Sequence, residues 1–198
     1  MAYVTAQEYQ EWLSRMSNGN VSLPSADIEL IEIFLADAEA WLEDRTDRWF
    51  EGRLQTRYYD EKCVDWNDGG RLLLDADLLT VAELTNGNGL IVPVNSYRLG
   101  PLNTSPKWSI RLSAGAGWVF PQEGLIAVTG MWGNMMTPNA TIKRMVKRIA
   151  YHIQATRTAG STVQQLPDGG RLFEAALPPD VYDWVRNNKR LRGSYESS

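Results

Sequence analysis

The amino-acid sequence predicts an α+β fold: an α-helical core with an inserted small antiparallel β sub-domain and a C-terminal helical tail. Three patterns lead to this prediction. Apolar residues recur at helical spacing before about residue 46 and again after about residue 138. Between these regions apolar and polar residues alternate, and glycine-rich turns separate the alternating runs. A last short stretch near the C-terminus again has helical spacing.

The expected domain boundaries follow these changes of period. The helical core should comprise residues 1–52 and 134–160, with two helices before the β sub-domain and one long helix after it. The β sub-domain should cover residues 53–133, in about six short strands. The C-terminal arm should cover residues 161–198, with a short helix at about 178–189.

The first helix is predicted by a capping box, in which Thr5 and Glu8 satisfy each other's backbone amides. The second helix, at about 26–45, has an apolar face that should enter the core. Its members are Ile28, Ile31, Phe34, Leu35, Ala38 and Leu42. The opposite face is acidic, which is typical of a solvated surface but also fits a lining surface or a partner contact. It carries Asp27, Glu29, Glu32, Asp37, Glu39 and Glu43.

Alternating apolar and polar residues predict the strands of the β sub-domain. The sequence N-G-N-G at 86–89 tolerates positive φ and predicts a hairpin turn. Pro93 cannot donate a backbone hydrogen bond, so the strand that contains it should end there or lie at the edge of the sheet. The expected runs are at 54–59, 72–74, 79–84, 91–94, 97–99, 108–112 and 126–132.

The long helix that follows should begin with Thr137 as its N-cap and Pro138 at the first helical position. Its apolar stripe consists of Ile142, Met145, Val146, Ile149 and Ile153. The remaining surface is basic and carries Lys143, Arg144, Lys147 and Arg148. These charges could meet the acidic face of the second helix, or the same face in a neighbouring copy. Contact with nucleic acid is a weaker alternative, because the whole chain is acidic.

The C-terminal helix should present Val181, Trp184 and Val185 on one side. A helix this short is not stable alone in water. It must therefore pack on the protein's own body or on a partner, because Trp184 would be costly to leave in water.

Composition argues against most catalytic chemistries. Cys63 and His152 are the single cysteine and histidine of the chain, which is too few for a zinc site, and no cofactor is expected. Neither a nucleotide-binding motif nor a serine-hydrolase motif occurs, so we expect that the protein is not an enzyme. A catalytic pair of carboxylates is the exception, because such a pair leaves no sequence motif. The net charge of −4 and the pI of about 5.1 disfavour a strong grip on DNA. No signal peptide or membrane span is predicted.

The order of several short motifs resembles one protein family, although no single motif is specific. The motifs are T-D-R-W-F-E-G-R at 46–53, T-R-Y-Y-D at 56–60, R-L-L-L at 71–74, L-L-T-V-A-E-L-T-N-G-N-G at 78–89, Y-R-L at 97–99, G-W at 117–118 and V-T-G-M-W-G at 128–133. In this order, over about residues 2–155, the chain is similar to the head–tail connector, or adaptor, proteins of long-tailed bacteriophages.

The resemblance implies a structural virion protein that is located in the neck of the particle, and in the host cytoplasm during assembly. Copies would form a ring, commonly a dodecamer, beneath the portal protein and above a tail-side connector, stopper or tail-completion protein. Double-stranded DNA would pass through the ring without specific binding, and no membrane would be involved.

The same resemblance gives roles to two groups of residues. The C-terminal segment at 177–192 would grip the portal protein. The expected contacts are Val181, Trp184, Val185, Arg190, Leu191 and Arg192. The charged helix faces would form the contact between subunits. The candidates are Asp37, Glu39, Glu43, Lys143, Arg144, Lys147 and Arg148. The alternative is a non-enzymatic module that binds a ligand such as a glycan through the β sub-domain, and exposed aromatic residues at one rim would favour it.

Overall fold

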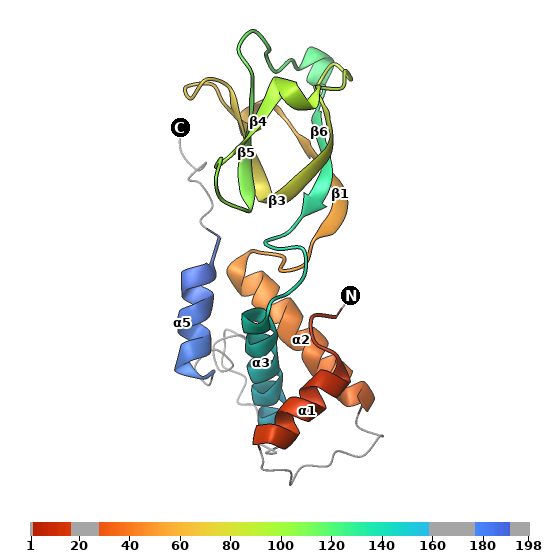
Figure 1. Cartoon of the computed structure of the whole chain (residues 1–198), viewed down its shortest axis with the longest axis vertical. Coiled ribbons are helices and arrows are strands. Elements are labelled where there is room, and N and C mark those ends of the chain that lie inside the picture. Colours follow the sequence, from red (N-terminus) through yellow and green to blue (C-terminus); the bar gives the residue numbers. More distant parts are fainter. Residues whose placement is uncertain (1, 17–27, 159–176, 191–198) are drawn as a thin grey trace. The chain divides into compact units, whose positions relative to one another are not determined.

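The computed structural model describes residues 2–16, 28–158 and 177–190. These residues form two compact units, which are considered separately below (Figure 1). The helical unit comprises residues 1–47 and 138–191, and the β unit comprises residues 48–137. Helices and an antiparallel sheet together make an α+β fold, as predicted.

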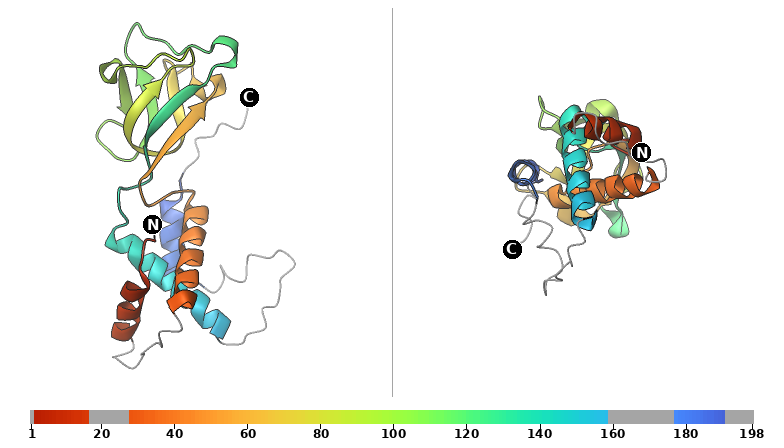
Figure 2. Two further views of the ribbon diagram at one scale, coloured as in Figure 1. Left: turned by 90° about the vertical axis from the view of Figure 1, so that its right-hand side faces the viewer. Right: turned by 90° about the horizontal axis from the view of Figure 1, so that it is seen from below.

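The helical unit contains α1 (Ala6–Met16), α2 (Ile28–Thr46), α3 (Ala140–Thr158) and α5 (Pro179–Asn188). Both predicted apolar stripes of α2 and α3 are buried, apart from Ile28 at the start of α2. Tyr9 and Leu13 of α1 are buried as well, and the Tyr9 hydroxyl donates to Oε1 of Gln154 at 2.9 Å. Figure 2 shows α1, α2, α3 and α5 in two further views.

The predicted capping box begins α1. Thr5 Oγ1 accepts a hydrogen bond from the amide of Glu8 at 3.1 Å, and Glu8 Oε2 accepts one from the amide of Thr5 at 3.2 Å. Two donors of the first turn that have no partner within the helix are therefore satisfied.

The predicted start of α3 is wrong by two residues. Asn139, rather than Thr137, is the N-cap, because its Oδ1 accepts from the amide of Ile142 at 3.0 Å. The first helical residue is Ala140, so Pro138 lies before the helix. Asparagine is preferred over threonine as an N-cap, and Asn139 stands immediately before the first helical residue.

The β unit is a six-stranded antiparallel sheet in the order β1-β6-β3-β5-β4, with β2 paired to β3. The strands are β1 (Arg53–Tyr59), β2 (Val64–Asp65), β3 (Arg71–Thr85), β4 (Tyr97–Gly100), β5 (Lys107–Leu112) and β6 (Ile126–Trp132). The sheet curls around a core of its own (Figure 1). Its largest fully buried side chains are Trp132, Leu72, Leu78, Leu84, Ile110 and Ile126.

Two features of the sheet differ from the sequence-based prediction. The runs at 72–74 and 79–84 belong to one long strand, β3, whose register shifts between Leu73 and Leu78 disturb the alternation. The turn at 86–89 is confirmed, and the amide of Asn86 donates to the carbonyl of Leu90 at 2.9 Å. The chain after it forms only an isolated bridge between Thr85 and Ile91, since Pro93 precedes a 3-10 turn.

The two ends of the β unit lie side by side. The amide of Asn134 donates to the carbonyl of Trp49 at 2.6 Å, and the amide of Gly52 donates to the carbonyl of Met136 at 3.2 Å. Gly133 permits this approach, because it has a φ of 151° and a Cβ there would lie 2.5 Å from the carbonyl oxygen of Glu51.

Candidate interaction surfaces

The basic residues of α3 are partly committed within the helical unit. Lys143 Nζ lies 2.8 Å from Glu8 Oε1, and this hydrogen bond is the main reason why the pKa of Glu8 is lowered. Arg148 forms an ion pair with Asp180 of α5. The α3 charges thus meet α1 and α5 within the chain, and among the described residues no ion pair joins them to the acidic face of α2. Burial lowers the pKa of Lys147.

Two of the three acidic candidates on α2 hold the N-terminal segment. Glu39 Oε1 accepts hydrogen bonds from the amides of Tyr3 and Val4 at 2.6 and 3.3 Å, and burial raises its pKa. Glu43 accepts a hydrogen bond from the Tyr3 hydroxyl. Tyr3 and Val4 are themselves buried, so these carboxylates contribute to the fold of the helical unit. Asp37 is exposed.

The exposed side of α2 carries a feature that the charge pattern concealed. Leu30 and Ile33 are 46% and 50% exposed, beside two exposed alanines. We call this surface the α2 outer face; it consists of Glu29, Leu30, Glu32, Ile33, Ala36, Asp37 and Ala40. Apolar side chains grouped in this way on a helix are typical of a contact surface. The sequence signal for this surface was the spacing of Leu30 and Ile33, which lie three residues apart and outside the buried stripe of α2.

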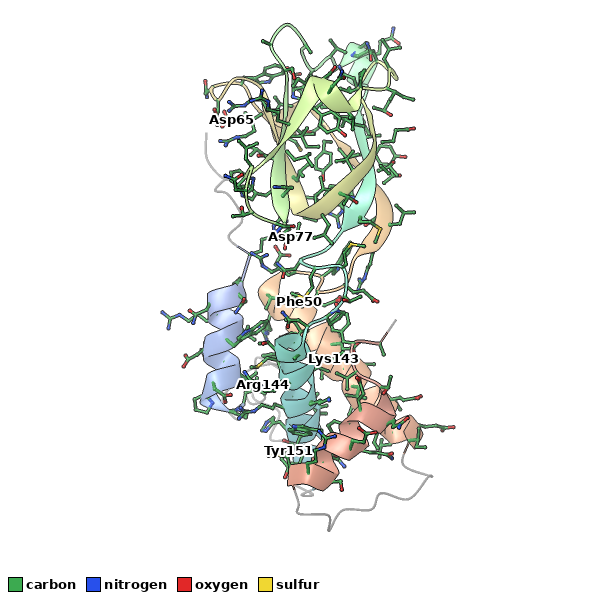
Figure 3. The ribbon with its side chains drawn as sticks, in the orientation of Figure 1. Phe50, Asp65, Asp77, Lys143, Arg144 and Tyr151 are labelled. Carbon is green, nitrogen blue, oxygen red and sulfur yellow. The ribbon has the colours of Figure 1, made fainter. Side chains whose placement is uncertain are left out.

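One exposed side of α3 complements that surface in charge. Residues 144, 148, 151 and 155 follow each other along one face of the helix. We call this set the α3 outer face: Arg144, Arg148, Tyr151 and Ala155. Tyr151 is 53% exposed, and Arg144 is exposed and makes no ion pair within the described part of the chain. Figure 3 labels Arg144 and Tyr151 on α3.

The C-terminal helix α5 packs on the helical unit. Val181 and Val185 are buried against α2 and α3, and the amide of Arg190 donates to the carbonyl of Thr46 at 2.8 Å. Trp184 is half-buried, and Tyr182 on the outward side is 49% exposed. Leu191 and Arg192 lie outside the described residues. The role of this segment in gripping a portal protein remains a prediction.

Most tryptophans of the β unit serve its own structure. Trp118 and Trp132 are buried, and their ring N–H groups donate to the carbonyls of Gly70 and Gln55 at 2.8 and 2.9 Å. The Arg57 guanidinium lies 4.8 Å from the ring of Trp49 and 5.1 Å from that of Trp132. The exposed aromatic residues of this unit include Tyr58, Trp66 and Trp108.

The titratable groups that composition singled out have unreactive surroundings. Burial, assisted by Asp60, raises the pKa of the Cys63 thiol to about 11. Burial also lowers the pKa of His152. Across residues 2–16, 28–158 and 177–190, no three His, Cys, Asp or Glu side chains are grouped to hold a metal ion. Within the same ranges no helix has the length and apolar character to cross a membrane.

Solved structures of particle necks share this fold. A chain in the neck of an empty gene transfer agent (GTA) particle, computed with C6 symmetry, has a TM-score of 0.63 at 16% identity over 96% of this chain and 91% of that chain. A chain of the native GTA virion has a TM-score of 0.58 at 18% identity, over 96% of this chain and 91% of that chain. A chain of the native GTA neck, computed with C12 symmetry, gives 0.57 at 17% identity, over 98% and 94%.

At these identities the likeness shows a common fold over nearly the whole of both chains. The chain therefore has the fold of chains found in solved phage-like particles and their necks, as the predicted resemblance implies. No protein-family model and no curated protein matches the sequence.

Proposed function

We propose that this protein is a non-enzymatic adaptor of a phage-type virion neck. It would form a ring, most simply a dodecamer, beneath the portal protein, extend the DNA channel and join the capsid to the tail. The observation that carries this proposal is the fold shared with GTA neck chains over more than nine-tenths of both chains, one of them in a neck with C12 symmetry. The acidic chain suits a channel that DNA passes without being held.

The helical unit supplies a contact that suits a closed ring. A ring needs two different surfaces on each copy, so that each subunit meets the next head to tail. The α2 outer face is apolar and acidic, whereas the α3 outer face is basic and carries Tyr151. We assign these two surfaces to the contact between adjacent copies. Lys143, Arg148, Glu39 and Glu43 already have partners within the subunit. Arg144 is therefore the basic residue of the α3 outer face that we assign to the contact with the next copy.

The C-terminal segment supplies the proposed contact with the portal protein. Trp184 and the basic residues after it are the expected anchors, and many copies in a ring would bind firmly even if each arm binds weakly. Because Val181 and Val185 are buried on the chain's own helices, α5 would serve as the fixed base from which the last residues reach the partner.

Deleting the gene from a phage or GTA producer tests the proposal in its biological setting. The proposal predicts filled or empty heads and complete tails that accumulate separately, as seen by negative-stain electron microscopy. Restoring the gene in trans should restore joined particles. Joined, infectious or DNA-transferring particles in the deletion strain would contradict the adaptor role.

A further inference from the structure

Three arginines stand in one row across the β unit. Arg71 on β3 pairs in register with Arg111 on β5, and Arg111 pairs with Arg98 on β4. Residues in register share a face of the sheet, and like charges directly opposite each other destabilise strand pairing. Only register brings these residues together, because they are far apart in the sequence. Anions beside such a row would offset this repulsion.

The chain places two carboxylates beside the row, because Asp65 on β2 lies in register with Arg71 and Asp68 follows shortly after it. Asp68 forms ion pairs with both Arg71 and Arg111. The Asp65 carboxylate positions it, since Asp65 Oδ1 accepts from the amides of Asn67 and Asp68 at 3.1 and 3.2 Å. Figure 3 labels Asp65 in the β unit. Arg71 and Arg111 thus share the Asp68 carboxylate, and Arg71 also has Asp65 opposite it on β2. The exposed side chain of Arg98 makes no ion pair or hydrogen bond within the described residues.

The arginines also line a cavity. It has a volume of about 310 Å³ and is formed by Arg71, Arg98, Leu99, Gly100, Pro101, Leu102, Ser109 and Arg111. Lys107 fixes one wall, because its ammonium group donates to the carbonyls of Pro101, Leu102 and Thr104 at 2.5, 2.9 and 2.6 Å. Gly100 keeps the wall close to the sheet, since a Cβ there would lie 2.6 Å from Ser109 Oγ.

Arg71, the first arginine of the row, is held in place by its neighbours. Its guanidinium carbon lies 5.3 Å from the centre of the Trp108 ring, which restricts its movement. Its Nε is buried and has no hydrogen-bond partner in the described part of the chain, so an incoming carboxylate would meet the terminal nitrogens of this guanidinium. Guanidinium groups fixed in this way are suited to paired hydrogen bonds with the two oxygens of a carboxylate.

We propose that this cavity, the arginine-row site, binds a carboxylate side chain on an acidic segment of a partner protein. The β unit has eight Lys and Arg residues against nine Asp and Glu residues, a net charge of −1, which gives little general attraction for nucleic acid. The rim includes Leu102, 70% exposed, and the nearby Trp108 is 43% exposed. Apolar and aromatic side chains around fixed arginines are typical of a protein interface. This site extends beyond the ring and portal contacts proposed above.

The test uses the full-length protein and the peptide acetyl-Leu-Asp-Glu-Leu-amide, with acetyl-Leu-Asn-Gln-Leu-amide as the neutral control. Arginine Nε–H and backbone signals are followed by NMR during titration. We expect saturable shifts at Arg71, Arg98 and Gly100 with the acidic peptide alone. Arg98→Gln should weaken binding by roughly tenfold or more, as expected for a lost charge-assisted hydrogen bond. Lys62→Gln, which removes an exposed charge of the same unit outside the cavity, should leave it unchanged.

Three results would overturn the proposal. Equal shifts with both peptides would show that the carboxylate is not recognised. Equal loss of binding in the Arg98 and Lys62 variants would show a general charge effect. A short DNA duplex that binds the same residues more tightly than the peptide, at the same salt concentration, would assign the site to a phosphate backbone instead. The Arg98 variant should keep the melting temperature of the parent, because its side chain is exposed.

Discussion

Asn139 fixes the first turn of α3 through a single side-chain hydrogen bond to the amide of Ile142. Replacing an N-cap asparagine by alanine typically costs about 1 kcal/mol of stability. We therefore expect Asn139→Ala to lower the free energy of unfolding of the helical unit by about that amount, measured by urea denaturation followed by circular dichroism. Thr137→Ala is the matched control and should stay within about 0.5 kcal/mol of the parent, as exposed positions usually do. Equal effects of the two substitutions would contradict the assigned cap.

Cys63 gives a residue-scale prediction of pH dependence. Its thiol donates to Asp60 Oδ1 at 3.4 Å, and burial together with this carboxylate raises its pKa to about 11. A raised thiol pKa means less thiolate at neutral pH, so alkylation by iodoacetamide at pH 7.5 should be much slower than that of free cysteine. The rate should rise with pH until about pH 11. Asp60→Asn should accelerate the reaction at pH 7.5, and an unchanged rate would remove Asp60 as a cause.

Among the elements, α2 and α3 carry the proposed contact between subunits. Arg144→Glu should block ring closure while leaving the subunit folded, because Arg144 is exposed and makes no ion pair in the described chain. Ile33→Arg should do the same from the other surface. Ring formation on portal particles can be counted by electron microscopy, and folding checked by circular dichroism.

Lys62→Glu makes the same change of charge as Arg144→Glu, but in the β unit. It should leave ring formation intact. If both variants assembled as well as the parent, the α3 outer face would not be part of the subunit contact.

Trp184 of α5 has two possible roles, and a substitution can distinguish between them. If Trp184 anchors the arm on a portal protein, Trp184→Ala should weaken binding by roughly 2–4 kcal/mol per copy. The measurement is calorimetric titration of portal rings with the full-length protein. Tyr182→Ala, which removes an exposed aromatic ring from the same helix, is the control. Unchanged portal binding with a lowered melting temperature would place Trp184 in the core of the helical unit instead.

The elements also show how far the sequence determines what can be predicted. Strongly periodic segments such as α1 and β6 were predicted, because one face of each is buried and their residue pattern reports it. Strand β3 was divided in two, since its bulges break the alternation near Asp75 and Asp77. The exposed Leu30 and Ile33 were missed because acidic neighbours dominate that face of α2.

Long-range pairing accounts for what the sequence could not reveal. The row of Arg71, Arg111 and Arg98 exists only through strand register, and no local pattern encodes it. In the same way, the charges of α3 were expected to meet the acidic face of α2, in the same chain or in a neighbouring copy. Within the chain, Glu8 and Asp180 compensate two of them instead. A count of charges on a helix face gives no information on which distant element supplies the partner.

At the scale of the whole molecule, the account rests on assembly with other proteins. The proposed ring on a portal protein draws its support from the fold shared with GTA neck chains and from the complementary helix faces. If the portal protein acts as the template of the proposed ring, the free protein need not form that ring alone. The mass of the free protein is therefore a weak test.

The most direct measurement is native mass spectrometry of the full-length protein mixed with portal rings encoded in the same genome. The account predicts one complex that contains a whole-ring complement of this chain, with twelve copies on a twelve-fold portal. The absence of any complex, even at high protein concentration and low salt, would contradict the central claim.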